Sequence, residues 1–304
     1  MNPFFSPNAA TLVAVATAEA APPLLVSSHA APTACLNCAT PLTDKFCSHC
    51  GQPASTHRLD LRHLLHEIPH SIWHVDKGLF YTLRELLRRP GATILGYMRG
   101  QRTQHFAPLS LLLLVTGVAS FLALKLHIGE RAQEALSPDA AAELRAAHTH
   151  GSEAVLHYMG WLYLVAAPFV ALFARRVLRR SGLNLAETLV AVLYITAAGN
   201  LLSLLLTPGY YWVRTGASYA TMSVIGTLVF TAYQTWAYGQ LLLETTLSRL
   251  GRWWRGLLVA LATYGLVIVA TLVLMFASNW GEYQKGFQKE VERQHQLRAA
   301  PPRS

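Results

Sequence analysis

The chain contains little charge. Of its 304 residues, 13% are Asp, Glu, Lys or Arg, whereas a soluble domain has roughly 25%. Hydrophobic residues make up 52% of the chain, and the mean hydropathy is +0.29. Because the apolar residues are gathered in blocks, this composition excludes an ordinary soluble domain for most of the chain and indicates a membrane protein.

Cysteine is absent outside residues 35–50, and basic residues are absent before Lys45. The first absence excludes a disulfide framework that runs through the fold. The second absence argues against a signal peptide, which usually begins with a basic segment. The apolar run Thr11–Ala18 is also short for a signal peptide and is followed by Glu19. We therefore predict that residues 1–34, which are rich in Ala and Pro, form a disordered tail.

Signatures of common catalytic sites are missing as well. The chain has no P-loop, nucleophile elbow or dinucleotide fingerprint. The string 66–70 reads H-E-I-P-H, but a zinc-protease site needs these residues on one helical turn, which Pro69 disrupts. A membrane metalloenzyme remains a third hypothesis because five histidines fall close together: His57, His63, His66, His70 and His74.

Long apolar blocks are what the chain does contain. Five of them approach the ~20 residues that a spanning helix needs, and lipid leaves the backbone no alternative to helix in such segments. They lie near 106–127, 155–174, 185–206, 218–243 and 256–278. The predicted fold is an all-α integral membrane helical bundle of about five spans at 106–278, preceded by a small four-cysteine module and followed by a polar tail at 279–304.

Basic residues alternate between the segments that connect these blocks. Residues 53–105, 175–180 and 249–255 are rich in Arg, whereas 128–154 is acidic and 207–217 holds only Arg214. The positive-inside rule then places the Arg-rich segments in the cytoplasm of an inner-membrane protein. Five spans leave the C-terminus outside. The basic residues of the tail argue against that, so four or six spans are alternatives.

The net charge of +9 has the same explanation. Topology and contact with anionic lipid account for it, and no nucleic-acid partner is expected. Within the juxtamembrane region 53–105, the stretch 82–89 is amphipathic, Pro90-Gly91 interrupts it, and 92–98 predicts a second short helix. We expect two interfacial helices on the cytoplasmic leaflet, with a soluble subdomain packed on the bundle as the alternative.

The four cysteines form two CxxC pairs, Cys35/Cys38 and Cys47/Cys50, within residues 35–52. Each pair can turn two thiolates toward one ion, and two pairs complete a closed, tetrahedral zinc site. The sequence therefore predicts a zinc-ribbon-like module with one structural zinc and no catalytic residue. A redox pair of CxxC motifs is the alternative, and His49 is a weaker fifth candidate ligand.

Two stretches resemble a known family. They are CLNCATPLTDKFCSHCGQ at 35–52 and DKGLFYTLRELLRRPGATILGYMRGQRTQHFAPLS at 76–110. Together they resemble a bacterial membrane-protein family catalogued as domain of unknown function number 3667, with Gln101 as a small departure. The resemblance implies an N-terminal zinc ribbon, a juxtamembrane region and several spans, and it implies no activity.

Two functional hypotheses rank ahead of the metalloenzyme. The first is a non-enzymatic protein whose cytoplasmic zinc ribbon docks a protein partner, with the bundle as its membrane anchor. The second is a transporter or channel with an uncharged polar path lined by Asn200, Gln234 and Gln240. A polar cavity at mid-depth between the third and fourth spans would favour the second hypothesis.

Overall fold

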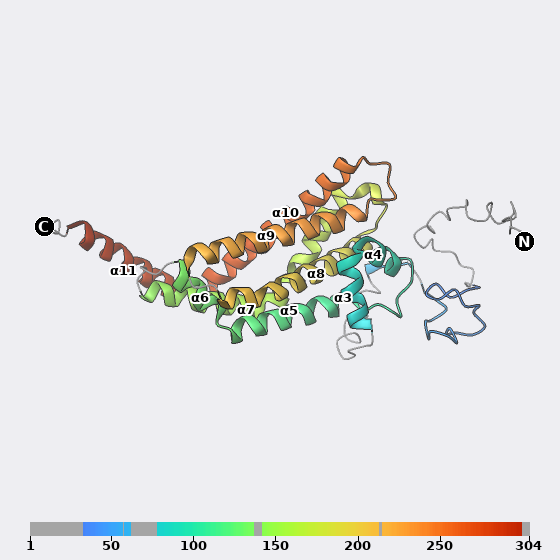
Figure 1. Ribbon diagram of the computed structural model, residues 1–304, viewed down its shortest axis with the longest axis horizontal. Coiled ribbons are helices and arrows are strands. Elements are labelled where there is room, and N and C mark those ends of the chain that lie inside the picture. Colours follow the sequence, from blue (N-terminus) through green and yellow to red (C-terminus); the bar gives the residue numbers. More distant parts are fainter. Residues whose placement is uncertain (1–32, 57, 62–77, 137–141, 213–214, 300–304) are drawn as a thin grey trace, which may run out of the picture.

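The computed structural model describes residues 33–56, 58–61, 78–136, 142–212 and 215–299 (Figure 1). These residues are almost entirely helical, and their β-structure consists of two isolated bridges, Ala34–Pro41 and Phe46–Pro53. The predicted all-α fold is confirmed. The predicted tail up to residue 32 and the five histidines of segment 57–74 lie outside the described residues.

Four of the described helices are long and apolar enough to cross a membrane. They are α5 (Pro108–Lys125), α7 (Ala142–Val177), α8 (Leu185–Trp212) and α10 (Arg249–Ser278). These helices contain four of the five predicted spans. Pro168 lies inside α7 and Pro208 inside α8.

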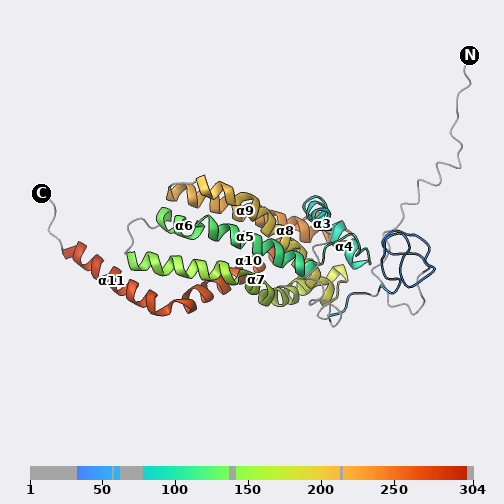
Figure 2. The same cartoon turned by 90° about the horizontal axis from the view of Figure 1, so that it is seen from below.

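The fifth predicted span is α9 (Gly216–Gln240), which has 25 residues, more than α5, but falls short of the apolarity that these four helices reach. Its sequence is rich in Ser, Thr and Tyr, which lowers its hydropathy without adding charge. It nevertheless runs antiparallel to α8, where Gly199 lies close to Phe230 and Gly209 lies close to Met222. It also runs antiparallel to α10, where Gly256 lies close to Thr235 and the Tyr264 hydroxyl lies 3.2 Å from that of Thr227. Five helices thus lie side by side (Figures 1 and 2).

The outer surface of this bundle is apolar. Large hydrophobic side chains that are more than half exposed include Trp161, Phe169, Leu205, Leu228 and Val273. Water would make such a surface an aggregation hazard, whereas lipid tails solvate it at no cost. The bundle therefore has the surface expected of a membrane protein.

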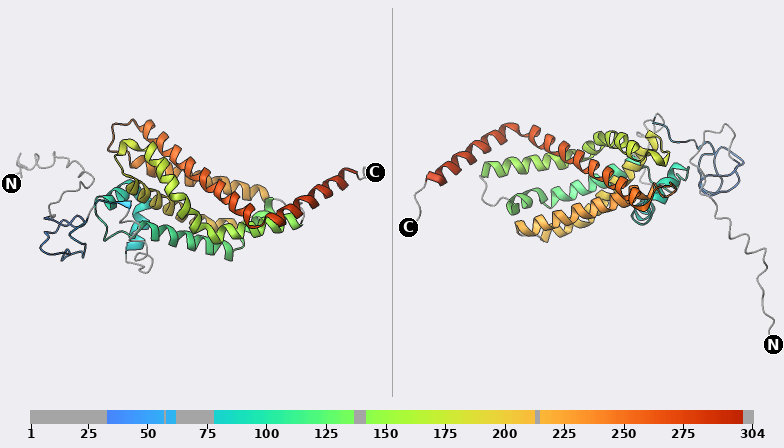
Figure 3. Two further views of the ribbon diagram at one scale, coloured as in Figure 1. Left: turned by 180° about the vertical axis from the view of Figure 1, so that it is seen from behind. Right: turned by 90° about the horizontal axis from the view of Figure 1, so that it is seen from above.

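The two ends of the bundle carry different elements (Figure 3). At one end lie the cysteine module, α3 (Gly78–Arg88), α4 (Pro90–Met98) and the short 3-10 turn η1 (Arg179–Ser181). At the other end lie α6 (Ile128–Leu136) and α11 (Trp280–Ala299). Most of the predicted polar tail is thus the helix α11, which packs on α7 where the rings of Tyr283 and His148 lie 5.1 Å apart.

The helices α3 and α4 differ in their surroundings. Helix α3 is amphipathic: it buries Thr82, Glu85 and Leu86 and leaves Phe80 81% exposed. Helix α4 has eight of its nine residues buried. It is enclosed because Gly91 lets it approach α9 closely; a Cβ there would lie 2.5 Å from Cβ of Gln240. Of the two expected interfacial helices, α3 alone presents an exposed amphipathic face, and α4 packs on the bundle.

Candidate metal centre and its attachment to the bundle

The two CxxC pairs fold into two matching turns. In the first, the Ala39 amide donates to the Cys35 carbonyl at 2.8 Å, and the Cys35 amide donates to the Thr40 carbonyl at 2.8 Å. In the second turn, the Gly51 amide donates to the Cys47 carbonyl at 2.9 Å, and the Cys47 amide donates to the Gln52 carbonyl at 2.8 Å. The repeated hydrogen bonds give each turn the same shape, so the module is a pair of equivalent knuckles.

Each turn closes on a residue in the left-handed region. Gly51 has φ +75°, which costs glycine nothing, but Ala39 has φ +60° at the equivalent position. A left-handed conformation costs an L-residue roughly 1–2 kcal/mol. The first knuckle thus carries backbone strain that the second lacks.

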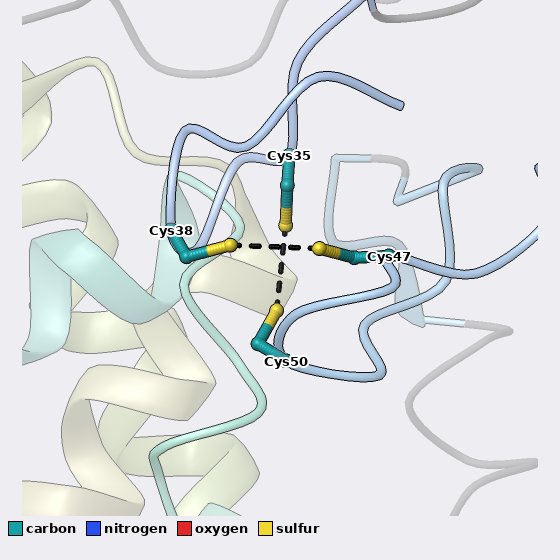
Figure 4. Close-up of side chains that lie close together, drawn as sticks. All are labelled: Cys35, Cys38, Cys47 and Cys50. Carbon is teal, nitrogen blue, oxygen red and sulfur yellow. Dashed lines mark hydrogen bonds between the residues drawn. The ribbon is translucent and has the colours of Figure 1, made fainter. Parts of the chain in front are cut away.

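The four sulfur atoms converge on one point between the knuckles (Figure 4). Cys35 Sγ lies 3.5 Å from Cys50 Sγ, Cys38 Sγ lies 3.5 Å from Cys47 Sγ, and all four lie within 4.8 Å of one another. In a tetrahedral site with Zn–S bonds of about 2.3 Å, the sulfurs are roughly 3.8 Å apart. The cluster therefore has the donor set and the spacing of a four-thiolate zinc site.

The thiols differ in acidity. The Thr40 hydroxyl, 3.2 Å from Cys38 Sγ, and the Thr40 backbone lower the pKa of Cys38 to about 6. Burial raises the pKa of Cys50 to about 11. Because a metal binds thiolates, an ion held by these four residues would be bound with release of thiol protons, so its affinity would fall as the pH falls.

A zinc ion held by this cluster would have a structural role. Four thiolates fill the tetrahedral coordination of zinc, so no position is left for water or substrate. His49 is exposed and lies outside the group of side chains that could share an ion. The cluster consists of the four cysteines that the sequence predicted as ligands.

Gln52 joins the module to the bundle. Its side chain is 2% exposed, and its Oε1 accepts from the Arg102 amide at 3.2 Å and from the Thr103 hydroxyl at 3.1 Å. Gly100, in the same turn, approaches Leu36 of the module so closely that a Cβ would lie 2.8 Å from Leu36 Cδ1. The module is therefore seated on the turn that leads into α5.

A second attachment follows the module along the chain. Arg58 Nε donates to Glu187 Oε1 at 2.7 Å, and Arg58 Nη2 donates to Glu187 Oε2 at 2.9 Å. Glu187 is fully buried in the first turn of α8. Its Oε2 accepts from the Asn184 amide at 2.8 Å, and its own amide donates to Asn184 Oδ1 at 2.9 Å. Asn184 Nδ2 also donates to the Leu59 carbonyl at 3.0 Å.

Sequence reasoning did not identify Gln52, Arg58 or Glu187 as attachment residues. One signal was present: Asn184-Leu-Ala-Glu187 is a capping-box pattern, in which the side chains of the first and fourth residues cap each other's amides. That pattern predicts a helix start at 185. It carries no information about a partner 129 residues away.

The structure separates the three residues of the predicted polar path. Asn200 lines a cavity between α7, α8, α9 and α10, where its Oδ1 accepts from the Tyr163 hydroxyl at 3.1 Å. Gln240 Oε1 accepts from the Gly91 amide at 3.1 Å, at the end of the bundle that carries the module. Gln234 is fully buried and is not among the residues that line the cavity.

A comparison with family models identifies one match. The family described as "Protein of unknown function (DUF3667)" matches residues 76–119, so the resemblance inferred from 76–110 is confirmed. The matched stretch runs through α3, α4 and the turn at Arg102 into α5, the part of the bundle on which the module sits. Searches among curated proteins and among solved structures found no match.

Proposed function

We propose that this chain is a non-enzymatic inner-membrane protein that holds a structural zinc ribbon at the cytoplasmic surface as a docking module for a protein partner. The observation that carries the proposal is the cluster of four cysteines within 4.8 Å, in a module fastened to one end of an apolar bundle. A ribbon fixed in this way presents its free face in a constant orientation relative to the membrane.

The orientation rests on the basic segments, which meet at the end that carries the module. Arg179 and Arg180 form η1, next to the start of α8 where Arg58 is bound. Arg99 Nη2 pairs with Glu244 at 2.6 Å in the connection between α9 and α10. Clustered Arg residues remain on the cytoplasmic side during membrane insertion, so this end faces the cytoplasm.

The same end suits an anionic leaflet. On α3, Arg84 and Arg88 are exposed at one-turn spacing from exposed Phe80, and exposed Arg89 directly follows the helix. Basic side chains next to an exposed aromatic ring are the pattern of an interfacial helix. In this proposal α3 contacts anionic headgroups and holds the module close to the membrane surface.

The docking face centres on Phe46. This side chain is 61% exposed, and its neighbours Thr43, Asp44 and Lys45 are exposed as well. A module this small has no hydrophobic core in which the Phe46 ring could be buried. Exposed aromatic side chains are typical anchors of protein interfaces. We assign Phe46 as the main contact of the ribbon with its partner.

Zinc analysis of the purified full chain tests the metal. Wild-type protein is expected to carry about one zinc ion per chain, and Cys35→Ser to carry none. Replacing exposed Ser48 by Ala is the matched control, because Ser48 lies between Cys47 and Cys50 and supplies no ligand. Equal zinc in wild type and Cys35→Ser would refute the site.

Photo-crosslinking in cells tests the docking role. A crosslinking residue at position 46 should give one discrete protein adduct, and the same residue at exposed position 60, beyond the module, should not. The adduct should disappear when Cys35→Ser unfolds the ribbon. No adduct at position 46, or one that survives Cys35→Ser, contradicts docking by the folded module.

Reporter fusions test the orientation. If all five helices cross, the C-terminus lies on the opposite side of the membrane from the ribbon. Alkaline phosphatase fused after residue 304 should then be active and green fluorescent protein should be dark. The reverse result would mean either an even number of crossings or a ribbon on the outer side of the membrane, and labelling of the four cysteines by a membrane-impermeant thiol reagent in intact cells separates the two.

The two alternative hypotheses gain less support. A cavity with polar lining does lie between the third and fourth predicted spans, α8 and α9, as the transporter hypothesis requires. A continuous uncharged path would also need Gln234 and Gln240 along the same channel, and Asn200 alone of the three lines the cavity. The metalloenzyme hypothesis rests on histidines outside the described residues.

A further inference from the structure

A cavity of about 260 Å³ lies inside the bundle. It is enclosed by one or more residues from each of α7, α8, α9 and α10, four helices that meet around it. Its polar lining residues include Tyr163, Asn200, Ser203, Tyr210, Thr227 and Tyr264, and Leu206, Phe230 and Val267 contribute apolar surface.

The cavity extends from about mid-depth of the bundle toward the end that is remote from the ribbon. Asn200 is fifteen residues after Leu185, the first residue of α8, which places it about 22 Å along that helix. Tyr210 lies ten residues further, near the connection to α9. A ligand in the cavity would therefore sit in the half of the bundle that is remote from the metal cluster.

The polar groups of the cavity are neutral. The Asn200 side chain is fixed by a hydrogen bond within the fold, in which its Nδ2 donates to the Thr116 hydroxyl at 2.8 Å. The Thr227 and Tyr264 hydroxyls lie 3.2 Å apart. The hydroxyls of Ser203 and Tyr210 make no hydrogen bond within the described part of the chain. These hydroxyls can donate to or accept from a ligand without breaking a bond of the fold.

We propose that this cavity is a binding site for a neutral, mainly apolar molecule that carries a hydroxyl or carbonyl group. A charged ligand is disfavoured, because no residue that lines the cavity carries an opposite charge and burying an unpaired ion is costly. A 150 Å³ apolar cavity holds benzene, so 260 Å³ holds roughly ten non-hydrogen atoms. The ligand class is thus a small phenol, alcohol or ketone that enters from the membrane.

This inference is independent of the zinc ribbon, since the cavity and the metal cluster share no residue. The probe is tritiated 2-naphthol, a neutral bicyclic phenol of about the predicted size. Its binding is measured on the full chain in nanodiscs, with protein-free nanodiscs as the background. Saturable binding of about one molecule per chain is expected.

Two glycines give a matched pair of variants. A Cβ on Gly226 would lie 3.3 Å from the Tyr210 hydroxyl, inside the cavity, whereas a Cβ on Gly265 would meet nothing within 4 Å. Gly226→Leu should fill the cavity and weaken binding at least tenfold. Gly265→Leu adds the same side chain to the exposed face of α10 and should leave binding unchanged.

Thr227→Val keeps the shape of the cavity and removes one hydroxyl, so it gives a second test if Gly226→Leu does not fold. It should weaken 2-naphthol severalfold, while competition by naphthalene, which has no hydroxyl, should stay the same. Absence of saturable binding, or equal loss in Gly226→Leu and Gly265→Leu, overturns the site. Naphthalene that competes as well as 2-naphthol in wild type overturns the ligand class.

Discussion

Arg58 and Glu187 form a bidentate ion pair. The pair joins the segment that follows the cysteine module to the first turn of α8, 129 residues further along the chain. Glu187 is fully buried, and the Arg58 side chain is 35% exposed. The contact raises the pKa of Arg58, because the carboxylate stabilises the charged guanidinium. Together with Gln52, this pair determines where the ribbon sits on the bundle.

Removing the cation of this pair should destabilise the protein. Arg58→Ala leaves the Glu187 carboxylate buried without its partner, and we expect a loss of about 2 kcal/mol, a value reduced because Arg58 is partly exposed. Arg58→Lys should lose about half as much, since an ammonium group cannot bind both oxygens at once. Denaturant titration in detergent micelles measures both.

Arg84→Ala is the control for that prediction, because Arg84 is an exposed arginine of α3. It should change the free energy of unfolding by less than about 0.5 kcal/mol. A loss for Arg58→Ala no larger than for Arg84→Ala would mean that the pair does not hold the segment. A double-mutant cycle with Glu187→Gln isolates the coupling.

Because the two knuckles are equivalent, opposite substitutions at their left-handed positions should change the zinc affinity in opposite directions. Gly51→Ala places a side chain at φ +75° and should weaken zinc binding about fivefold, which corresponds to roughly 1 kcal/mol. Ala39→Gly relieves the same strain at φ +60° and should strengthen zinc binding, by less because glycine also gains freedom in the unfolded chain. Competition with a chelator measures both, and a change of the same sign in the two variants would contradict the equivalence of the knuckles.

Close packing of α9 against α10 predicts a second contrast. A Cβ on Gly256 would collide with the Thr235 carbonyl oxygen of α9 and lie 3.2 Å from the Gly239 nitrogen. Backbone atoms cannot move aside alone, so Gly256→Ala should cost about 1–3 kcal/mol. Gly265→Ala, on the open face of the same helix, should be neutral or stabilising by up to about 1 kcal/mol. Thermal unfolding of the two variants provides the comparison.

His105 predicts a dependence of stability on pH. It lies in the turn before α5, where burial lowers its pKa although the Glu85 carboxylate opposes that shift. Its native pKa is therefore below the unfolded value of about 6.5, so its contribution to stability is present above that pH and is lost as the pH falls. Between about pH 7.5 and 5.5, wild type should lose more thermal stability than His105→Phe. An equal loss in both would show that His105 does not contribute.

The residues that sequence reasoning identified correctly belong to local patterns. Two CxxC pairs eight residues apart predicted the cysteine cluster, because the turn within each pair is set by its own few residues. The spans were predicted from block length and composition, since a spanning helix must satisfy its backbone within itself. The α9 segment was harder to assign, because its hydroxyl groups lower its hydropathy while its packing places it beside α8 and α10.

What the sequence by itself determined is the apolar, helical character of the bundle and the grouping of the four cysteines, because both follow from residue type and short spacing. The tertiary structure alone decided that α4 is enclosed by protein, that Arg58 meets Glu187, and that Asn200 lines a cavity while Gln234 and Gln240 do not. These outcomes depend on which faces of distant helices meet. A helical pattern says that a face is apolar or polar, but packing between helices selects its partner.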